Sequence, residues 1–375
     1  MIEPKEVYDS FIQNGIKFFT GVPDSLLKDF CSYISDNAGN ENHVISTNEG
    51  SAIALAAGYY LATSQPALVY MQNSGLGNSV NPILSLADSE VYGIPMILMI
   101  GWRGEPGKKD EPQHVKQGRV MLGILDAMEL PYFILDKDSD NINELIQNAV
   151  RLSCEKNSPV ALIVREGAFK KYDLKNNDTN NYTLSREETI GLLIENLDGD
   201  EIIISTTGKA SRELYEYRER KNQSHEKDFL TVGSMGHSSQ IALGIAFQKK
   251  NKKVYVIDGD GALLMHLGAA AVCGTAAPDN FRHILINNGS HESVGGQQTA
   301  GFKVNFLEMA KACGYKSSSS AETRDDVLKE IGKLKSEKGP LFLEIKVNKN
   351  SRSDLGRPTA SPCQNKEIFM KYLSD

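Results

Sequence analysis

The sequence has few cysteines, no long apolar run and no excess of positive charge. Its five cysteines are scattered over 375 residues without a CxxC pair, which argues against a disulfide framework or a zinc site and is typical of reduced thiols in a cytosol. No apolar stretch approaches the ~20 residues of a membrane-spanning helix. The formal charge of −7 disfavours non-specific binding to nucleic acid. We therefore expect a cytoplasmic protein without a nucleic-acid or membrane partner.

Short apolar runs recur along both halves of the chain and are separated by longer helical patterns. They lie at 43–47, 67–71, 95–100, 132–136 and 161–164 in the first half, and at 201–206, 253–259, 282–288 and 341–347 in the second. Continuous apolar runs of strand length are typical of parallel strands that are covered on both faces. The pattern predicts an α/β protein of two domains, each a mostly parallel sheet with helices on both faces.

The predicted boundary between the two domains is a polar segment. Residues 170–185 contain four asparagines and few apolar side chains, so we expect a linker between a first domain at 1–169 and a second at 186–375. Ser185 and Glu188 at its end match a helix capping box. The second domain is therefore expected to begin with a helix.

The segments that follow two predicted strands of the second domain carry ligand-binding residues. Residues 259–261 (Gly-Asp-Gly) end one strand, and the asparagine pair 287–288 ends the next, after 25 intervening residues (262–286). The carboxyl ends of strands are where open α/β sheets bind ligands. Aspartate and asparagine oxygens suit Mg²⁺, and glycines with a helix N-terminus suit phosphate. The glycine turn alone indicates only a tight turn, whereas the combination predicts a phosphate and metal site.

These two motifs at this spacing resemble the cofactor fingerprint of the thiamine diphosphate-dependent decarboxylases. The resemblance implies that thiamine diphosphate binds here with Mg²⁺, held by Asp260, Asn288 and the main-chain carbonyl of Ser290. Met235 occupies the position of the apolar residue that supports the cofactor in this family, although by itself it would be an ordinary core residue. The implied cofactor-binding positions are Gly233, Met235, Gly259, Asp260, Gly261, Ala262 and Asn288.

Gly208 and Lys209 follow the predicted strand 201–206, so their backbone donors could also bind the diphosphate. They lack the spacing of a P-loop.

Three residues are candidates for catalysis. The resemblance implies that Glu49 bonds to the cofactor's pyrimidine ring and assists removal of the thiazolium proton, whereas in isolation it would only complement a helix dipole. His114 lies in the Gly-, Pro- and charge-rich segment 101–118, and His291 follows Asn288 by three residues. Histidine titrates near neutral pH, so either ring could donate a proton or stabilise a carbanion.

The length of 375 residues leaves no room for the third domain of larger family members. This restricts the resemblance to the short branch of phosphonopyruvate and sulfopyruvate decarboxylases. Segments that match this branch are 71–79, 103–114, 205–214, 287–297 and 351–358. The implied reaction converts the small 2-oxo acid 3-phosphonopyruvate to phosphonoacetaldehyde and CO₂, in phosphonate biosynthesis of the 2-aminoethylphosphonate type. The resemblance also implies a homodimer or larger assembly, with each site formed by two subunits.

The substrate's phosphonate group is expected to be bound by arginines. The carboxylate must leave as neutral CO₂, so a strong cationic clamp on it would oppose the reaction. Arg352 and Arg357 follow the predicted strand 341–347, and guanidinium forks match phosphonate oxygens. The alternatives are a solvated tail in which these arginines pair with Asp354, or an anion site in the 101–118 segment at Arg103, Lys108 or Lys109.

Other functions remain as alternatives. Sulfopyruvate decarboxylase shares every cofactor motif but is often divided into two chains near the predicted linker. A binding or regulatory protein of the same fold without turnover is disfavoured by the presence of Glu49 and Asp260. A nicotinamide dehydrogenase is disfavoured because no strand is followed by GxGxxG.

Overall fold

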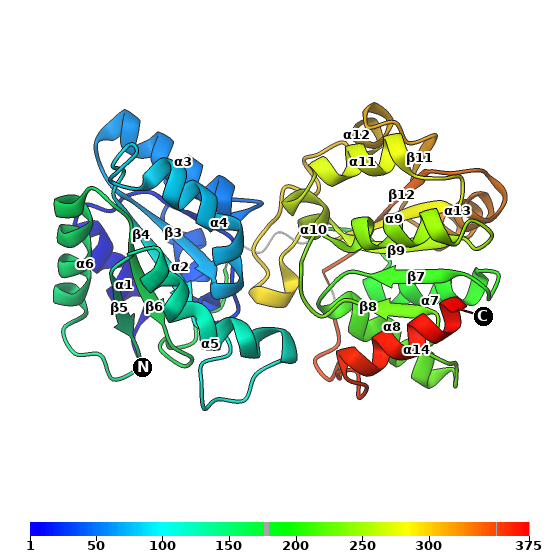
Figure 1. The fold of residues 1–375 in the computed structure, drawn as a ribbon, viewed down its shortest axis with the longest axis horizontal. Helices are drawn as coiled ribbons and strands as arrows, with labels where there is room; N and C mark the ends of the chain where they lie inside the picture. Colours follow the sequence, from blue (N-terminus) through cyan, green and yellow to red (C-terminus); the bar gives the residue numbers. More distant parts are fainter. Residues whose placement is uncertain (176–179, 350, 375) are drawn as a thin grey trace. The chain divides into compact units, whose positions relative to one another are not determined.

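The chain forms two compact units, each built on its own sheet (Figure 1). The computed structural model describes residues 1–175, 180–349 and 351–374. Among these, the first unit contains residues 1–175 and 291–298, and the second contains 180–290 and 299–374. Residues 176–179 of the predicted linker lie outside the described residues.

The sheet of the first unit has the strand order β2-β1-β3-β4-β6-β5, with parallel pairing throughout its described strands. Its strands are β1 (Phe19–Gly21), β2 (His43–Ile45), β3 (Ala67–Gln72), β4 (Met96–Gly101), β5 (Tyr132–Leu135) and β6 (Val160–Val164). Its helices are α1 (Pro4–Gln13), α2 (Lys28–Asn37), α3 (Glu49–Thr63), α4 (Leu76–Pro82), α5 (Pro112–Ala127) and α6 (Ile142–Lys156), with shorter turns η1 (Asn73–Gly75), η2 (Ile83–Ala87) and η3 (Glu292–Val294).

The sheet of the second unit has the order β8-β7-β9-β10-β12-β11, again parallel in its described strands. Its strands are β7 (Ile202–Ser205), β8 (Asp228–Leu230), β9 (Val254–Gly259), β10 (Phe281–Asn287), β11 (Ser317–Ala321) and β12 (Leu341–Lys346). Its helices are α7 (Arg186–Asn196), α8 (Lys209–Arg220), α9 (Ser238–Gln248), α10 (Asp260–Met265), α11 (Gly268–Ala276), α12 (Phe306–Ala312), α13 (Arg324–Ser336) and α14 (Pro362–Ser374). The predicted capping box of Ser185 and Glu188 is present at the start of α7.

The two sheets share one topology. In each, the first strand is followed by an edge strand on one side, and the chain then crosses back to place the third strand on the other side. The order of the strands therefore reverses between β1 and β3 and between β7 and β9. The carboxyl ends of the strands at such a reversal form the usual binding crevice of an open α/β sheet. Each unit thus presents one candidate binding edge.

Both faces of each sheet are covered by apolar packing, as the continuous apolar runs predicted. All six residues of β4 are buried, and Ile97 and Met99 pack into one cluster while Leu98 and Ile100 pack into the cluster on the opposite face. The sheet of the second unit likewise lies between two apolar clusters. The prediction of an α/β fold with two parallel sheets is confirmed.

Three strands were not predicted because their sequences carry no long apolar run. β1 and β8 contain only three residues each, and β11 (Ser317–Ala321) is a polar edge strand of four serines and an alanine. These strands are defined by pairing with longer neighbours rather than by their own side chains. Among the described helices, none combines the length and apolarity needed to cross a bilayer.

Candidate active site

Asp260 is a buried carboxylate at the carboxyl end of β9. It is the first residue of α10 and is 2% exposed. The Thr299 hydroxyl and the backbone N–H groups of Gly261 and Asn288 donate hydrogen bonds to it. Within the described part of the chain, no lysine or arginine forms an ion pair with it, and burial raises the pKa of Asp260 to about 6. A bound cation would stabilise the ionised form of such a group.

The turn after β10 carries the other predicted metal ligands, and its Asn288 lies next to Asp260 through the backbone hydrogen bond between them. Asn288 and Ser290 are both buried, and the Ser290 N–H donates to Oδ1 of Asn288 at 3.1 Å. A Cβ atom at Gly301 would come within 2.5 Å of Oδ2 of Asp260, so only glycine fits beside this carboxylate. Among the described residues no three His, Cys, Asp or Glu side chains gather as a metal site. The donor set here is instead one carboxylate with amide and carbonyl oxygens, which fits Mg²⁺.

The glycine loop after β8 packs against α10. Gly236 has φ of 83°, and a Cβ there would lie 2.8 Å from the carbonyl oxygen of Ala262. This close approach brings the loop that carries Gly233 and the half-buried Met235 next to the turn 259–262. The predicted cofactor residues after β8 and β9 are therefore neighbours.

Gly208 and Lys209 lie at the carboxyl end of β7, the strand beside β9. Gly208 has φ of 94° and precedes α8, whose first residue is Lys209. The Lys209 ammonium donates to Oγ of Ser351 at 2.5 Å. A glycine turn that leads into a helix N-terminus is suited to phosphate oxygens.

Glu49 is enclosed at the start of α3 in the first unit. The side chain of Asn48 caps this helix by accepting from the N–H of Gly50 at 2.8 Å. Glu49 is buried, and Nδ2 of Asn78 donates to its Oε2 at 2.7 Å. A Cβ at Gly75 would come within 2.6 Å of its Oε1. The carboxylate is thus held in one place, as a hydrogen-bonding partner for a cofactor ring must be.

The two candidate histidines both belong to the first unit. His114 lies in the first turn of α5, and its Nδ1 is 3.0 Å from Oδ1 of Asp110. His291 begins the segment 291–298, which groups with the first unit, whereas Asn288 belongs to the second. The His291 N–H donates to the Gln297 carbonyl at 2.8 Å, and burial lowers the pKa of His291 to about 4. His291 is therefore neutral at physiological pH.

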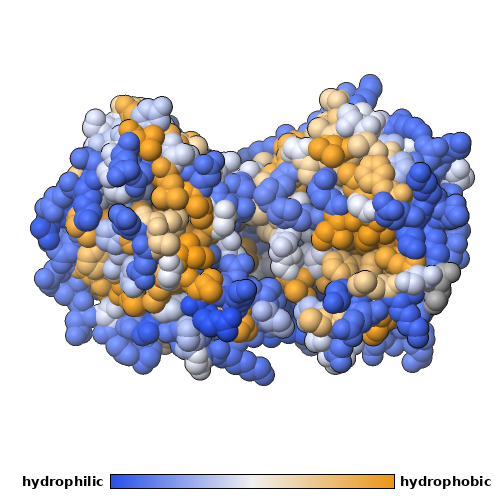
Figure 2. Space-filling view, in the orientation of Figure 1, coloured by the Kyte–Doolittle hydropathy of each residue, from blue (hydrophilic) through white to orange (hydrophobic). Residues whose placement is uncertain are grey.

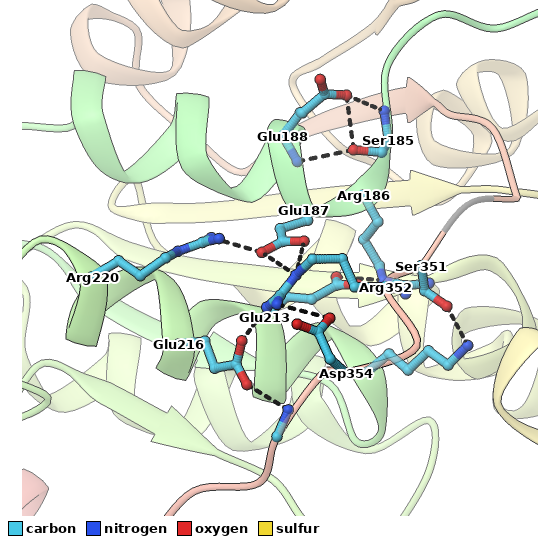
Figure 3. Close-up of polar contacts among 12 residues, drawn as sticks. Ser185, Arg186, Glu187, Glu188, Glu213, Glu216, Arg220, Ser351, Arg352 and Asp354 are labelled. Atoms are coloured by element: carbon cyan, nitrogen blue, oxygen red, sulfur yellow. Dashed lines mark hydrogen bonds and ion pairs between the residues drawn. The ribbon is translucent and has the colours of Figure 1, made fainter.

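Arg352 is surrounded by three carboxylates, as Figure 3 shows. Its Nε lies 2.9 Å from Oε2 of Glu187 and its Nη1 lies 3.1 Å from Oδ1 of Asp354, while its Nη2 pairs with Glu216. These anions raise the pKa of Arg352 above its usual value. The contacts tie the segment after β12 to α7 and α8. Arg357, five residues further, is exposed.

Sequence reasoning named Asn287 as part of the asparagine pair but missed the contacts by which it supports the turn after β10. Asn287 is fully buried, and its Nδ2 donates to the Gly301 carbonyl at 2.9 Å and to Oε1 of Glu344 at 2.8 Å. Glu344 is a buried carboxylate on β12. A charged residue inside the apolar run 341–347 was the only sequence signal for this support.

Replacing Asp260 by Asn should stabilise the metal-free protein while weakening cofactor binding. The pKa of Asp260 is about 6 in the folded state against 3.8 for a free aspartate, so stability is lost as the pH rises through this interval. At neutral pH we expect Asp260→Asn to raise the free energy of unfolding by roughly 1–3 kcal/mol. Urea denaturation of the metal-free protein measures this, and titration with thiamine diphosphate and Mg²⁺ measures the loss of affinity.

The matched control is Asp279→Asn, which removes a half-exposed carboxylate of the same unit that pairs with Lys316. It should leave both the free energy of unfolding and the cofactor affinity close to those of the parent, because exposed ion pairs contribute little to stability. An Asp260→Asn variant that is less stable than the parent, or that binds the cofactor and metal normally, would contradict the assignment.

Comparison with known proteins places both units in one family. Residues 6–129 match the family described as "Thiamine pyrophosphate enzyme, N-terminal TPP binding domain", and residues 206–345 match "Thiamine pyrophosphate enzyme, C-terminal TPP binding domain". Both predictions, of the family and of thiamine diphosphate as its cofactor, are confirmed.

Full-length relatives give a finer placement. The chain is 31% identical to a phosphonopyruvate decarboxylase of Streptomyces viridochromogenes, over 96% of this chain and 92% of the relative. It is 29% identical to a phosphonopyruvate decarboxylase of Streptomyces hygroscopicus, over 100% of this chain and 95% of that relative. A sulfopyruvate decarboxylase of Methanosarcina acetivorans is 28% identical, over 92% of this chain and 91% of that relative. The chain therefore belongs to the thiamine diphosphate-dependent decarboxylases, in the two-domain family that includes phosphonopyruvate decarboxylase.

Proposed function

We propose that this protein decarboxylates 3-phosphonopyruvate to phosphonoacetaldehyde and CO₂, with thiamine diphosphate and Mg²⁺, in phosphonate biosynthesis of the 2-aminoethylphosphonate type. The observation that carries the proposal is the full-length similarity to two phosphonopyruvate decarboxylases. The bound cofactor supplies an electron sink for the electron pair left by departing CO₂. The free cysteines of the described chain suit a cytoplasmic location.

We assign the binding of the two ends of the cofactor to different domains. In this proposal residues 1–169 bind the pyrimidine ring, with the enclosed Glu49 carboxylate as its hydrogen-bonding partner. Residues 186–375 bind the diphosphate through the glycine turns after β7, β8 and β9. Mg²⁺ is held by Asp260, Asn288 and the carbonyl of Ser290, because the buried and otherwise uncompensated Asp260 carboxylate fits a cation.

The two histidines have different proposed roles. His114, held through Nδ1 by Asp110, presents its other ring nitrogen for proton transfer to the product carbon. His291 is neutral at physiological pH because burial lowers its pKa to about 4, so it acts as a hydrogen-bonding group rather than as a cation. A His291→Asn variant that keeps full kcat would remove it from the mechanism.

The substrate is tested by measuring CO₂ release from phosphonopyruvate, sulfopyruvate and pyruvate in parallel. We expect phosphonopyruvate to give the highest kcat/KM and pyruvate the lowest. Sulfopyruvate is the close alternative, because a relative named sulfopyruvate decarboxylase aligns over both domains of this chain. Carrying both domains in one chain therefore does not discriminate between the two substrates. A preference for sulfopyruvate would overturn the substrate assignment and keep the reaction class.

Arg352 and Arg357 remain the proposed ligands of the phosphonate. Because Glu187, Glu216 and Asp354 already pair with Arg352, a phosphonate at this position must displace carboxylates. Arg352→Ala and Arg357→Ala should each raise KM for phosphonopyruvate, by an amount that corresponds to about 2–4 kcal/mol of lost binding free energy. The corresponding Lys variants should recover only part of this loss, because an ammonium group cannot form the two-pronged hydrogen bond of a guanidinium. Steady-state kinetics measures this effect. Unchanged KM in both Ala variants would instead favour the 101–118 segment as the anion site.

We propose that the protein is at least a homodimer with the site at the subunit interface. Both units carry exposed apolar side chains on helices, including Leu55 and Leu61 on α3, Phe247 on α9 and Val272 on α11. Figure 2 shows apolar surface gathered over these helices. Exposed apolar patches of this kind commonly mark contact surfaces between proteins.

Mixing two inactive variants tests this arrangement. Glu49→Ala and Asp260→Ala proteins should each be inactive alone. If Glu49 and Asp260 of one site come from different chains, subunit exchange creates hybrids in which one site carries both residues, so activity should return on mixing. CO₂ release after mixing, together with sedimentation of the parent protein, measures this. An active monomer would contradict the proposal.

A further inference from the structure

The loop between β4 and α5 is organised around one carboxylate, Asp110. Its Oδ2 accepts from Nε of Arg103 at 2.8 Å and from the N–H of Gly104 at 2.7 Å. Its Oδ1 accepts from the N–H of Glu111 at 2.7 Å and lies 3.0 Å from Nδ1 of His114. Nη2 of Arg103 adds a further ion pair. Asp110 therefore connects both ends of the loop to the first turn of α5.

The loop backbone is seated directly on α5. A Cβ at Gly104, which has φ of 69°, would collide with the carbonyl oxygen of His114, and a Cβ at Gly118 would collide with the carbonyl oxygen of Gly104. Nε1 of Trp102 donates to the Gly118 carbonyl at 2.9 Å. This backbone-to-backbone contact holds the loop of Asp110 close to the first turn of α5. The pairing of the Asp110 and His114 side chains therefore follows from how the backbone packs.

The loop is also attached to the neighbouring strand ends of the same sheet. Nδ2 of Asn73, directly after β3, donates to the Arg103 carbonyl at 2.7 Å. Nη1 of Arg103 donates to Oγ of Ser25, in the segment after β1, at 2.6 Å. The contacts place the Asp110–His114 pair near the carboxyl ends of β1, β3 and β4, where this sheet reverses its strand order.

The protonation of this pair follows from its partners. Hydrogen bonds from Arg103, His114 and two backbone N–H groups hold the pKa of Asp110 well below its usual range, so the carboxylate is ionised at neutral pH and can only accept. The hydrogen between Asp110 and His114 must therefore sit on Nδ1. In a neutral ring with Nδ1 protonated, Nε2 carries the free lone pair.

We propose that Asp110 is a positioning residue, which holds His114 in the Nδ1–H form and leaves Nε2 to receive and deliver the proton in the decarboxylation cycle. Arg103 compensates the charge of Asp110, so that the carboxylate orients the ring without becoming an unpaired buried anion. The use of Nε2 rests on the proposed function, whereas the orientation of the ring does not.

The first test is spectroscopic and needs no activity. In protein labelled with ¹⁵N-histidine, the His114 signal, assigned by its loss in His114→Gln, should show a protonated Nδ1 and an unprotonated Nε2 once the pH is high enough for the ring to be neutral. In Asp110→Ala no carboxylate accepts from Nδ1, so nothing holds the hydrogen on that nitrogen. The ring should then shift to the Nε2–H form, which a free neutral imidazole side chain favours. An unchanged ring form in Asp110→Ala would overturn the inference.

The second test compares rates. Asp110→Ala should lower kcat by about tenfold or more, as loss of an orienting partner does for other catalytic rings, with unchanged affinity for thiamine diphosphate and Mg²⁺. In a His114→Gln background the same change should cost less than about twofold, because the two residues act as one unit. If the two substitutions instead lowered kcat by separate factors that multiply in the double variant, the two residues would act independently and the inference would be wrong.

The matched control is Glu105→Ala in the same loop. Glu105 is equally buried and ion-paired, through Arg165 at 2.8 Å and Lys108 at 2.9 Å, but those pairs hold the other side of the loop. This variant should keep the Nδ1–H form of His114 and a kcat within about twofold of the parent. A loss of rate equal to that of Asp110→Ala would assign the effect to loop stability and overturn the proposal. A parent enzyme that releases no CO₂ from any 2-oxo acid would overturn the proposed function without altering the ring-form result.

Discussion

The site of the second unit depends on the burial of the Asp260 carboxylate without a protein cation. Taking an ionised carboxylate out of water is unfavourable unless opposite charge or hydrogen bonds replace the water. Thr299 and the backbone donors of Gly261 and Asn288 supply part of that replacement, and the rise in the pKa of Asp260 shows that they do not supply all of it. In the proposed function a bound cation would supply the rest, and its binding would then stabilise the folded protein.

The supporting structure around Asp260 is arranged so that this carboxylate cannot move away. Asn287 connects β10 to β12 through Glu344 and to the segment of Thr299 through the Gly301 carbonyl. The absence of a side chain at Gly301 leaves space for the carboxylate. In the first unit Gly75 and the Asn78 amide enclose Glu49, and the backbone N–H groups of Gly104 and Glu111 hold Asp110. Both units thus use close backbone packing to hold charged groups at the carboxyl edge of a parallel sheet.

In the segment after β12, Arg352 is both a structural ion-pair partner and the proposed ligand of an anionic substrate. Arg352 is tied to Glu187, Glu216 and Asp354, and the adjacent Ser351 accepts from Lys209 at the start of α8. These contacts hold the segment on the same unit that carries the turn of Asp260. A guanidinium with three carboxylate partners is well fixed in place, but it offers an anionic substrate less net positive charge than an unpaired arginine would.

The sequence by itself determined the fold class, the family and nine of the twelve described strands, because apolar runs buried on both faces and the Gly-Asp-Gly and Asn-Asn motifs depend on local residue order. It also located the capping box of Ser185, for the same reason. It did not determine β1, β8 and β11, whose few or polar residues become strands only through pairing with neighbours. Nor did it reveal the partners of the site residues: Thr299 with Asp260, Glu344 with Asn287, Asp110 with His114 and three carboxylates with Arg352. Most of these pairs join separate elements, and even the short Asp110–His114 pair depends on how the loop packs on α5. Such contacts are decided by tertiary packing, because the charge state and orientation of a side chain depend on what the fold brings within hydrogen-bonding distance.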